Sequence, residues 1–177
     1  MESMDREPIR ILGIDPGLER VGFGVVSLLP CGQLVAEDWG VIKTSKKDAR
    51  PKRLVDIYDA INSLLSQTQP QAVAMEQLFF FRNITTIVPV CEARGAIQMA
   101  CYQAGFLPVE YTPPQIKLHI TGNGRADKTE IQDMVMVLLG LDGRPQPDDA
   151  ADGLAIALTH AYHVTTTTEA ATSLLHA

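Results

Sequence analysis

With 177 residues, 46% of them hydrophobic and 20% charged, the chain has the composition of one soluble globular domain with a hydrophobic core. Its apolar runs are too short to span a membrane, its first residues lack a secretory signal, and its three cysteines have no metal-ligand spacing, so we expect a cytoplasmic protein with reduced thiols. The formal net charge of −6 argues weakly against a nucleic-acid partner.

The first part of the chain is predicted to form three strands and a helix. Residues 9–15 are an apolar run that a Pro-Gly pair stops, which is typical of a buried strand. Residues 21–29 and 33–44 are two further strand-like stretches joined by a Pro-Cys-Gly turn, so the three strands form an antiparallel meander. Residues 53–66 have apolar side chains at helical spacing.

The second part alternates short strands with helices. The predicted strands cover residues 71–76 and 107–111, and the predicted helices cover residues 86–104, 114–120, 127–139 and 149–163. Pro89 is expected in the first turn of its helix, and Asp127 has the spacing of a capping box. This order predicts an α/β fold in which helices flank a mixed five-stranded sheet. We expect one domain over residues 9–164, a flexible segment 1–8 and a disordered tail 165–177.

Four carboxylates stand where these elements are expected to converge. Asp15 and Glu76 end two strands, while Asp149 and Asp152 lie three residues apart at the start of the last helix and project to one side. Asp15 before a Pro-Gly pair has the alternative role of a turn former, and Asp149 that of a helix cap. Glu76 and Asp152 favour function, because a charge that closes an apolar strand or lies past the cap position is seldom structural. Small neighbours such as Gly13 and Gly153 would let the helix approach the sheet.

Four carboxylates in one pocket repel one another, and divalent cations remove that repulsion. Oxygen ligands suit Mg²⁺ or Mn²⁺, and no Cys/His set in the sequence points to zinc or iron. Two Mg²⁺ ions per subunit, with Mn²⁺ as a substitute, would activate water and stabilise the leaving oxygen of a phosphodiester. The sequence therefore predicts a metal-dependent nuclease with the catalytic and metal-binding residues Asp15, Glu76, Asp149 and Asp152.

Basic residues gather in two regions despite the negative net charge. The segment from Lys43 to Arg53 carries six positive charges against one acid, and residues 111–126 include Lys117 and Arg125 but no acid. If the four carboxylates are counted as a metal site, the remaining charge is −6 + 4 = −2. Overall charge therefore settles nothing about DNA.

Four motifs together resemble a known family. ILGIDPG with a glycine-rich second strand, AMEQLFF, the tripeptide at residues 93–95 and DDAADGLAIALTH are similar, in order and spacing, to the RuvC-type Holliday-junction resolvases over about residues 9–163. The resemblance implies a ribonuclease H-like fold, a homodimer, and symmetric nicking of four-way junction DNA in recombination and repair, with a branch-migration helicase complex as a partner. It places the acidic quartet on the four carboxylates and a dimer contact on the helix at residues 86–104, whose alanines otherwise indicate packing inside a monomer.

The resemblance also implies DNA-contacting residues. Phe79, three positions after the glutamate, would stack on or wedge between bases, although a run of aromatic residues is usually core. Lys117 and Lys128 match basic positions that bind phosphate, although a surface lysine is usually just solvated. The remaining candidates are Arg82 and Asn83, beside that phenylalanine, and Arg125 in a glycine-rich loop. Arg94 has the alternative role of a structural ion-pair partner.

Three other functions are compatible with parts of the sequence. A strand followed by Gly22 and Gly24 is similar to the phosphate-binding hairpin of sugar-kinase and actin-like ATPases, but those proteins need a second domain that 177 residues do not supply. A non-catalytic junction-binding protein would not need an intact quartet. A ribonuclease H-like nuclease acting on RNA-containing substrates would need the same acids.

Overall fold

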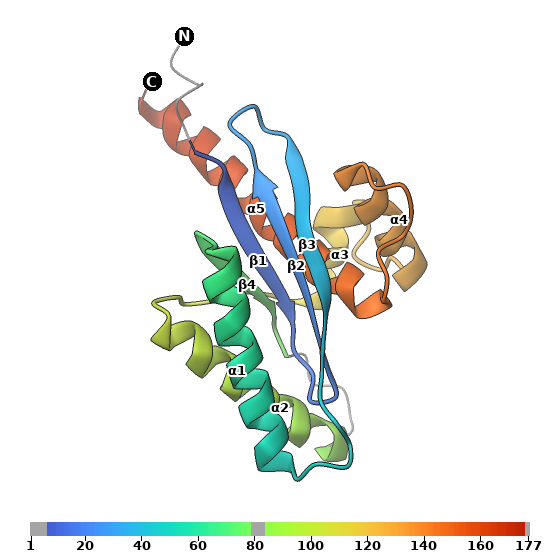
Figure 1. Cartoon of the computed structure of the whole chain (residues 1–177). Helices are drawn as coiled ribbons and strands as arrows, with labels where there is room; N and C mark the ends of the chain where they lie inside the picture. The colour runs from blue at the N-terminus through green and yellow to red at the C-terminus, as the bar shows by residue number, and fades with distance from the viewer. Residues whose placement is uncertain (1–6, 79–83, 176–177) are drawn as a thin grey trace.

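The computed structural model describes residues 7–78 and 84–175, with the backbone alone described for 84–86 and 167–175. Within these ranges the chain forms five strands and five helices (Figure 1). In chain order they are β1 (Ile9–Asp15), β2 (Arg20–Leu28), β3 (Leu34–Lys43), α1 (Arg50–Thr68), β4 (Ala72–Glu76), α2 (Ile84–Gln103), β5 (Val109–Tyr111), α3 (Pro113–Thr121), α4 (Lys128–Leu139) and α5 (Asp148–Leu175).

The strands form one mixed sheet in the order β3-β2-β1-β4-β5. Antiparallel pairing joins β1 to β2 and β2 to β3, as the predicted meander requires. Parallel pairing joins β1 to β4 and β4 to β5, and the chain crosses over through α1 and α2, as parallel neighbours require. The predicted ribonuclease H-like fold, with a mixed five-stranded sheet flanked by helices, is confirmed.

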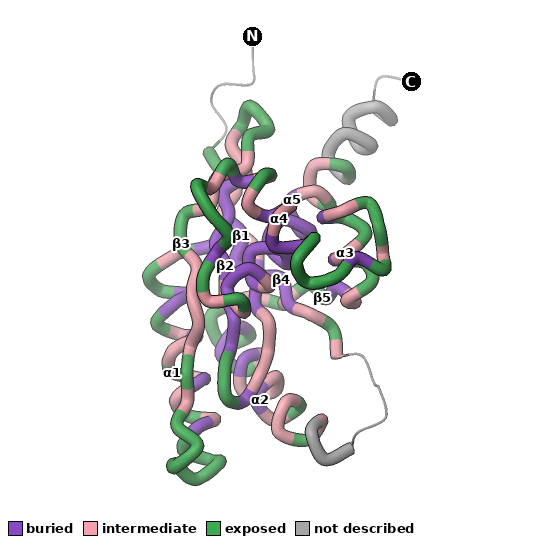
Figure 2. Tube along the Cα trace, turned by 90° about the vertical axis from the view of Figure 1, so that its right-hand side faces the viewer, coloured by how far each residue is buried: buried purple, intermediate pink, exposed green. Residues whose placement is uncertain are grey.

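The sheet separates two hydrophobic layers, because successive side chains of a strand point to opposite faces. Leu12 and Ile14 of β1 pack on one face with side chains of α1 and α2. Ile11 packs on the other face with side chains of α3, α4 and α5. In α5, residues 154–158 are at most 1% exposed, and Figure 2 shows the buried trace concentrated in the central strands and in this helix.

Glycines bring α5 into direct contact with β1 and β2. A Cβ added at Gly13 would lie 2.2 Å from the carbonyl oxygen of Gly153, and a Cβ added at Gly22 would lie 2.0 Å from that of Asp149. Real Cβ atoms essentially never come within 3.0 Å of a heavy atom of another residue to which they are not bonded, so glycine is needed at both positions. The prediction that small residues let the last helix approach the sheet is confirmed for Gly13 and Gly153.

Two helices begin at least two residues earlier than predicted. Helix α1 begins at Arg50 rather than at residue 53, because Pro51 fits the first turn, where its missing N–H would have no intrahelical acceptor. Helix α2 begins at Ile84 rather than at residue 86, so that Pro89 lies inside the helix and not in its first turn. Both boundary predictions were wrong because a proline was placed incorrectly relative to the start of its helix.

Helix α5 continues to Leu175, past the end predicted at residue 163 and through most of the segment for which we expected disorder. The hydroxyl groups of Thr165 and Thr166 donate to the carbonyl oxygens of the residues four positions earlier, at 2.9 and 2.8 Å. Such bonds give the threonine hydroxyls an acceptor inside the helix, although they slightly destabilise a helix. None of the helices in the described ranges is long and apolar enough to cross a membrane.

Candidate active site

Two of the predicted acids are the last residues of neighbouring strands, β1 and β4, and lie at the same end of the sheet. The parallel register places Ile14 opposite Met75, so the next residues, Asp15 and Glu76, leave the sheet side by side. Their side chains stand on the face that α5 covers, because Gly13, two residues before Asp15, contacts α5 there. The strand-end acids therefore face the helix that carries the other two.

The first turns of α5 supply Asp149 and Asp152. Backbone contact with Gly22 and Gly24 of β2 holds this end of the helix close to the end of β1. One carboxylate oxygen from each of Asp15, Asp149 and Asp152 lies within 4.8 Å of the others. The same backbone contact leaves no space for a nucleotide phosphate at Gly22 and Gly24, which the ATPase alternative would require.

Glu76 joins these acids through a shared cavity of about 210 Å³. Asp15, Glu76 and Asp152 line it together with Lys117 of α3 and Lys128 of α4. The rest of the wall is mainly apolar and consists of Pro113, Ile116, Ile131, Ala155 and Ile156. The structure thus brings the four predicted acids and two of the predicted basic residues to one place.

Both lysines stand on short helices whose N-termini are fixed by capping boxes. In α3 the side chain of Thr112 accepts from the backbone of the third helical residue, and Pro113 follows it. In α4 the predicted capping box is present, with Asp127 as the N-cap. The caps define where each helix begins, and Lys117 and Lys128 of these helices both line the cavity.

The acids oppose one another's ionisation. Burial raises the pKa of Asp15 well above its ordinary value, and the carboxylates of Glu76, Asp152 and Asp149 raise this pKa further. Burial, followed by repulsion from Asp152, raises the pKa of Glu76 to about 7, although Lys117 acts in the opposite direction. Raised carboxyl pKa values in a cleft are typical of a catalytic or cation-binding site.

Two basic side chains partly neutralise the acids of α5. Lys128 Nζ donates to Asp152 Oδ2 at 3.1 Å, yet the pKa of Asp152 remains raised because burial outweighs this hydrogen bond. Arg20, the first residue of β2, donates from Nη1 to Asp149 Oδ2 at 2.9 Å. Arg20 was not predicted, because no local pattern distinguishes it from another surface arginine.

Arg94 fixes the end of β4. Its Nη1 donates to the carbonyl oxygen of Glu76 at 2.7 Å, and its Nη2 forms an ion pair with Glu110 of β5. The Arg94 side chain is only 13% exposed. The structural role considered for this residue is confirmed, and it acts by holding the backbone that carries the strand-end glutamate.

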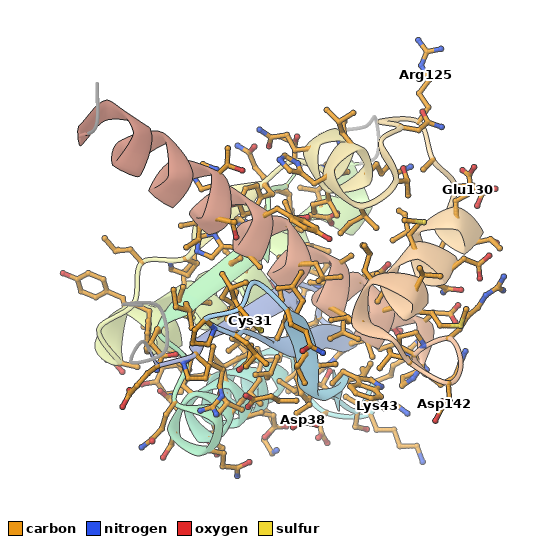
Figure 3. The ribbon with its side chains drawn as sticks, turned by 90° about the horizontal axis from the view of Figure 1, so that it is seen from above. Cys31, Asp38, Lys43, Arg125, Glu130 and Asp142 are labelled. Carbon is orange, nitrogen blue, oxygen red and sulfur yellow. The ribbon has the colours of Figure 1, made fainter. Side chains whose placement is uncertain are left out.

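Among the described residues, the predicted DNA contact Arg125 does not line the cavity. Arg125 is exposed in the loop between α3 and α4, and Figure 3 shows it pointing away from the body of the domain. Its role as a DNA contact stays a prediction. Outside the described residues lie Phe79, Arg82 and Asn83.

Comparison with known proteins agrees with this geometry. A family model described as crossover junction endodeoxyribonuclease RuvC matches residues 11–160, which include the four acids and both cavity lysines. The chain belongs to the RuvC family. A RuvC crossover junction endodeoxyribonuclease of Gloeobacter violaceus is 48% identical over 155 residues, covering 88% of this chain and 89% of that protein.

Solved structures of RuvC have the same fold. The structure of Thermus thermophilus RuvC gives a TM-score of 0.83 at 36% sequence identity and covers 90% of this chain and 98% of that chain. The structure of T. thermophilus RuvC in complex with a Holliday junction substrate gives a TM-score of 0.81 at 34% identity, covering 89% and 96%. The family resemblance predicted from the sequence motifs is therefore confirmed.

Proposed function

We propose that this chain is a Holliday-junction resolvase, which hydrolyses one phosphodiester bond in each of two opposed strands of a four-way junction. The observation that carries the proposal is the convergence of four acids: Asp15, Glu76 and Asp152 line one cavity, and a carboxylate oxygen of Asp149 lies within 4.8 Å of oxygens of Asp15 and Asp152. Membership of the RuvC family, one of whose members has been solved with this substrate, supports the same activity.

The four acids are proposed to hold two Mg²⁺ ions, with Mn²⁺ as a substitute. All their donor atoms are carboxylate oxygens, which these cations prefer. One carboxylate oxygen from each of Asp15, Asp149 and Asp152 lies within 4.8 Å of the others, so these side chains would hold a cation between them after moving closer together. Bound ions of this kind activate a water molecule and stabilise the leaving oxygen of a phosphodiester.

The lysines of the cavity are proposed to act on the phosphate. In the hydrolysis, a bond forms between water oxygen and phosphorus while the bond to the 3′ oxygen breaks, which leaves 5′-phosphate and 3′-hydroxyl ends. Lys117 and Lys128 line the cavity and would offset the charge that grows on the phosphate oxygens. To do so, Lys128 exchanges its hydrogen bond to Asp152 for one to the phosphate.

A cleavage assay on three substrates tests the proposal. With Mg²⁺ we expect paired nicks in a synthetic four-way junction and little cleavage of linear duplex or RNA–DNA hybrid. Asp15→Asn and Glu76→Gln should abolish cleavage and retain junction binding, because each removes a metal ligand without removing a basic contact. Full activity of either variant would contradict the assignment. Preference for the hybrid would favour a nuclease acting on RNA-containing substrates, and binding without cleavage by the wild type would favour a non-catalytic protein.

Two symmetric nicks require two active sites, and we propose that helix α2 joins two copies of the chain. Ala93 and Ala100, from the alanine stripe of this helix, are fully buried inside the monomer. The exposed face instead presents Val88, Met99 and Tyr102, which are 46%, 61% and 70% exposed. Apolar side chains gathered on a surface mark a contact site. Met99→Glu should convert a dimer to a monomer in analytical ultracentrifugation, and an unchanged sedimentation coefficient would contradict this contact.

A further inference from the structure

The basic segment from Lys43 to Arg53 takes no part in the site described above. It covers the end of β3 and the first turn of α1, and two of its arginines, Arg50 and Arg53, line a second hollow of about 460 Å³. Arg20 completes a set of three guanidinium groups there. The single acid of the wall, Glu19, is ion-paired with Lys46 at 2.9 Å. Arg20 and Arg50 are themselves ion-paired, with Asp149 at 2.9 Å and with Glu92 at 3.4 Å, so the lining of the hollow keeps an excess of positive charge that is partly neutralised.

Arg53 is built into the wall of this hollow. It is only 9% exposed, and its Nε donates to the hydroxyl of Thr44 at 2.8 Å. Its Nη2 is buried without a hydrogen-bond partner. A buried charged donor without an acceptor is costly. A ligand that displaces the groups now covering Nη2 would supply the missing acceptor.

The start of helix α1 adds to the positive potential. Its N-cap residue, Ala49, supplies no side-chain hydrogen bond, and its first turn contains no acid. The partial positive charge at the N-terminus of this 19-residue helix is thus not compensated from within the helix. The unpartnered nitrogen of Arg53 and the uncapped helix independently indicate an anion.

We propose that this hollow binds a backbone phosphate of the DNA strand, next to the position of cleavage. Arg20 lines the hollow and also donates to Asp149 at 2.9 Å, so the hollow adjoins the acid cluster. A guanidinium group binds a phosphate through two parallel N–H···O hydrogen bonds. The described lining residues include no aromatic side chain on which a base would stack, so the chemistry fits a phosphate rather than a base. The inference rests on the proposed function, because it places the substrate strand relative to the acids.

Two matched variants test the hollow. Arg50→Gln and Lys52→Gln each remove one positive charge from the first turn of α1. Each side chain has an acidic partner, Glu92 at 3.4 Å from Arg50 and Asp56 at 2.6 Å from Lys52, but of the two only Arg50 lines the hollow. Junction affinity is measured by fluorescence anisotropy in EDTA over a series of KCl concentrations. Arg50→Gln should weaken binding roughly tenfold and reduce the slope of log affinity against log salt by about 0.9, the values for one charge-assisted phosphate contact. Lys52→Gln should leave both near the wild type, and equal effects of the two variants would overturn the inference.

Inorganic phosphate provides a second measurement that does not depend on the junction. It should raise the melting temperature of the wild type and of Lys52→Gln more than that of Arg50→Gln. A phosphate effect without a junction effect would mean that the hollow binds a free anion, which overturns the inference while the proposed function stands. Failure of the wild type to bind a junction at all would overturn the proposed function and this inference together.

Discussion

Replacing Gly22 by alanine tests whether the contact between β2 and α5 sets the position of the acids. The added Cβ would lie 2.0 Å from the carbonyl oxygen of Asp149 and 3.3 Å from its Cβ, whereas real Cβ atoms keep at least 3.0 Å. The start of α5 or the strand must therefore move by at least 3.0 − 2.0 = 1.0 Å. The nearest atom belongs to the backbone, so no side-chain rotation relieves the clash. The carboxylate of Asp149 moves with the helix.

We expect junction cleavage by Gly22→Ala to fall about 100-fold, because a catalytic group displaced by about 1 Å loses roughly that factor. Stability should fall by about 1–3 kcal/mol, as overpacked contacts usually cost. Single-turnover cleavage and urea unfolding measure the two effects. Gly143→Ala is the control, because nothing lies within 4 Å of a Cβ at that position. A folded Gly22→Ala variant that cleaves like the wild type would refute the reasoning.

Three further predictions concern the free protein. The pKa of Glu76 is about 7 in the folded state instead of 4.5, so between these pH values the folded state binds more protons than the unfolded chain. The free energy of unfolding in EDTA should therefore fall as the pH rises from 4.5 to 7, and Glu76→Gln should flatten this dependence. In Asp15→Asn the carboxylate is absent whose ionised form burial and the neighbouring carboxylates destabilise. This variant should therefore have a higher melting temperature than the wild type in EDTA, and it should lack the increase in melting temperature that Mg²⁺ produces in the wild type. Arg94→Met should cost about 2 kcal/mol in urea unfolding, because it removes a charged donor from the Glu76 carbonyl.

Each of these predictions has a control and a contrary outcome. Glu7→Gln at an exposed position should leave the pH profile unchanged, and a flat profile for the wild type would contradict the first prediction. A lower melting temperature of Asp15→Asn in EDTA would contradict the second. For the third, Arg144→Met removes an exposed ion pair to Asp133 and should change stability little. Equal losses for the two arginine variants would rule out a special role of Arg94.

Much of the fold was predictable because its signals are local. The apolar runs that end in Asp15 and Glu76 predict both the strand and the position of the acid at its end. The spacing of Asp149 and Asp152 places both on one side of a helix whatever its surroundings. The parallel pairing of β1 with β4 then follows from the order of strands and helices, because crossover helices join parallel neighbours. These features together predict the convergence of the four acids.

Contacts between distant segments were not predictable in the same way. The ion pair between Arg20 and Asp149 joins residues 129 positions apart, and no local pattern distinguishes Arg20 from another surface arginine. Gly22 and Gly24 were considered as a phosphate-binding hairpin, but their lack of a Cβ serves the approach of α5. The alanines of α2 were similarly ambiguous, since small residues suit contacts inside a monomer as well as between copies. Three-dimensional packing decides such cases.

Helix α5 carries two of the acids and also residues 154–158, among the most buried of the domain. Natural selection for a foldable chain and for cleavage therefore acts on the same stretch of about three turns. A descendant can lose cleavage through a single substitution, because replacing Asp149 or Asp152 by a neutral side chain leaves the buried residues of the helix and the fold unchanged. A descendant that keeps cleavage has little freedom there, so its evolutionary divergence is expected to accumulate in the strand at the far edge and in the loops.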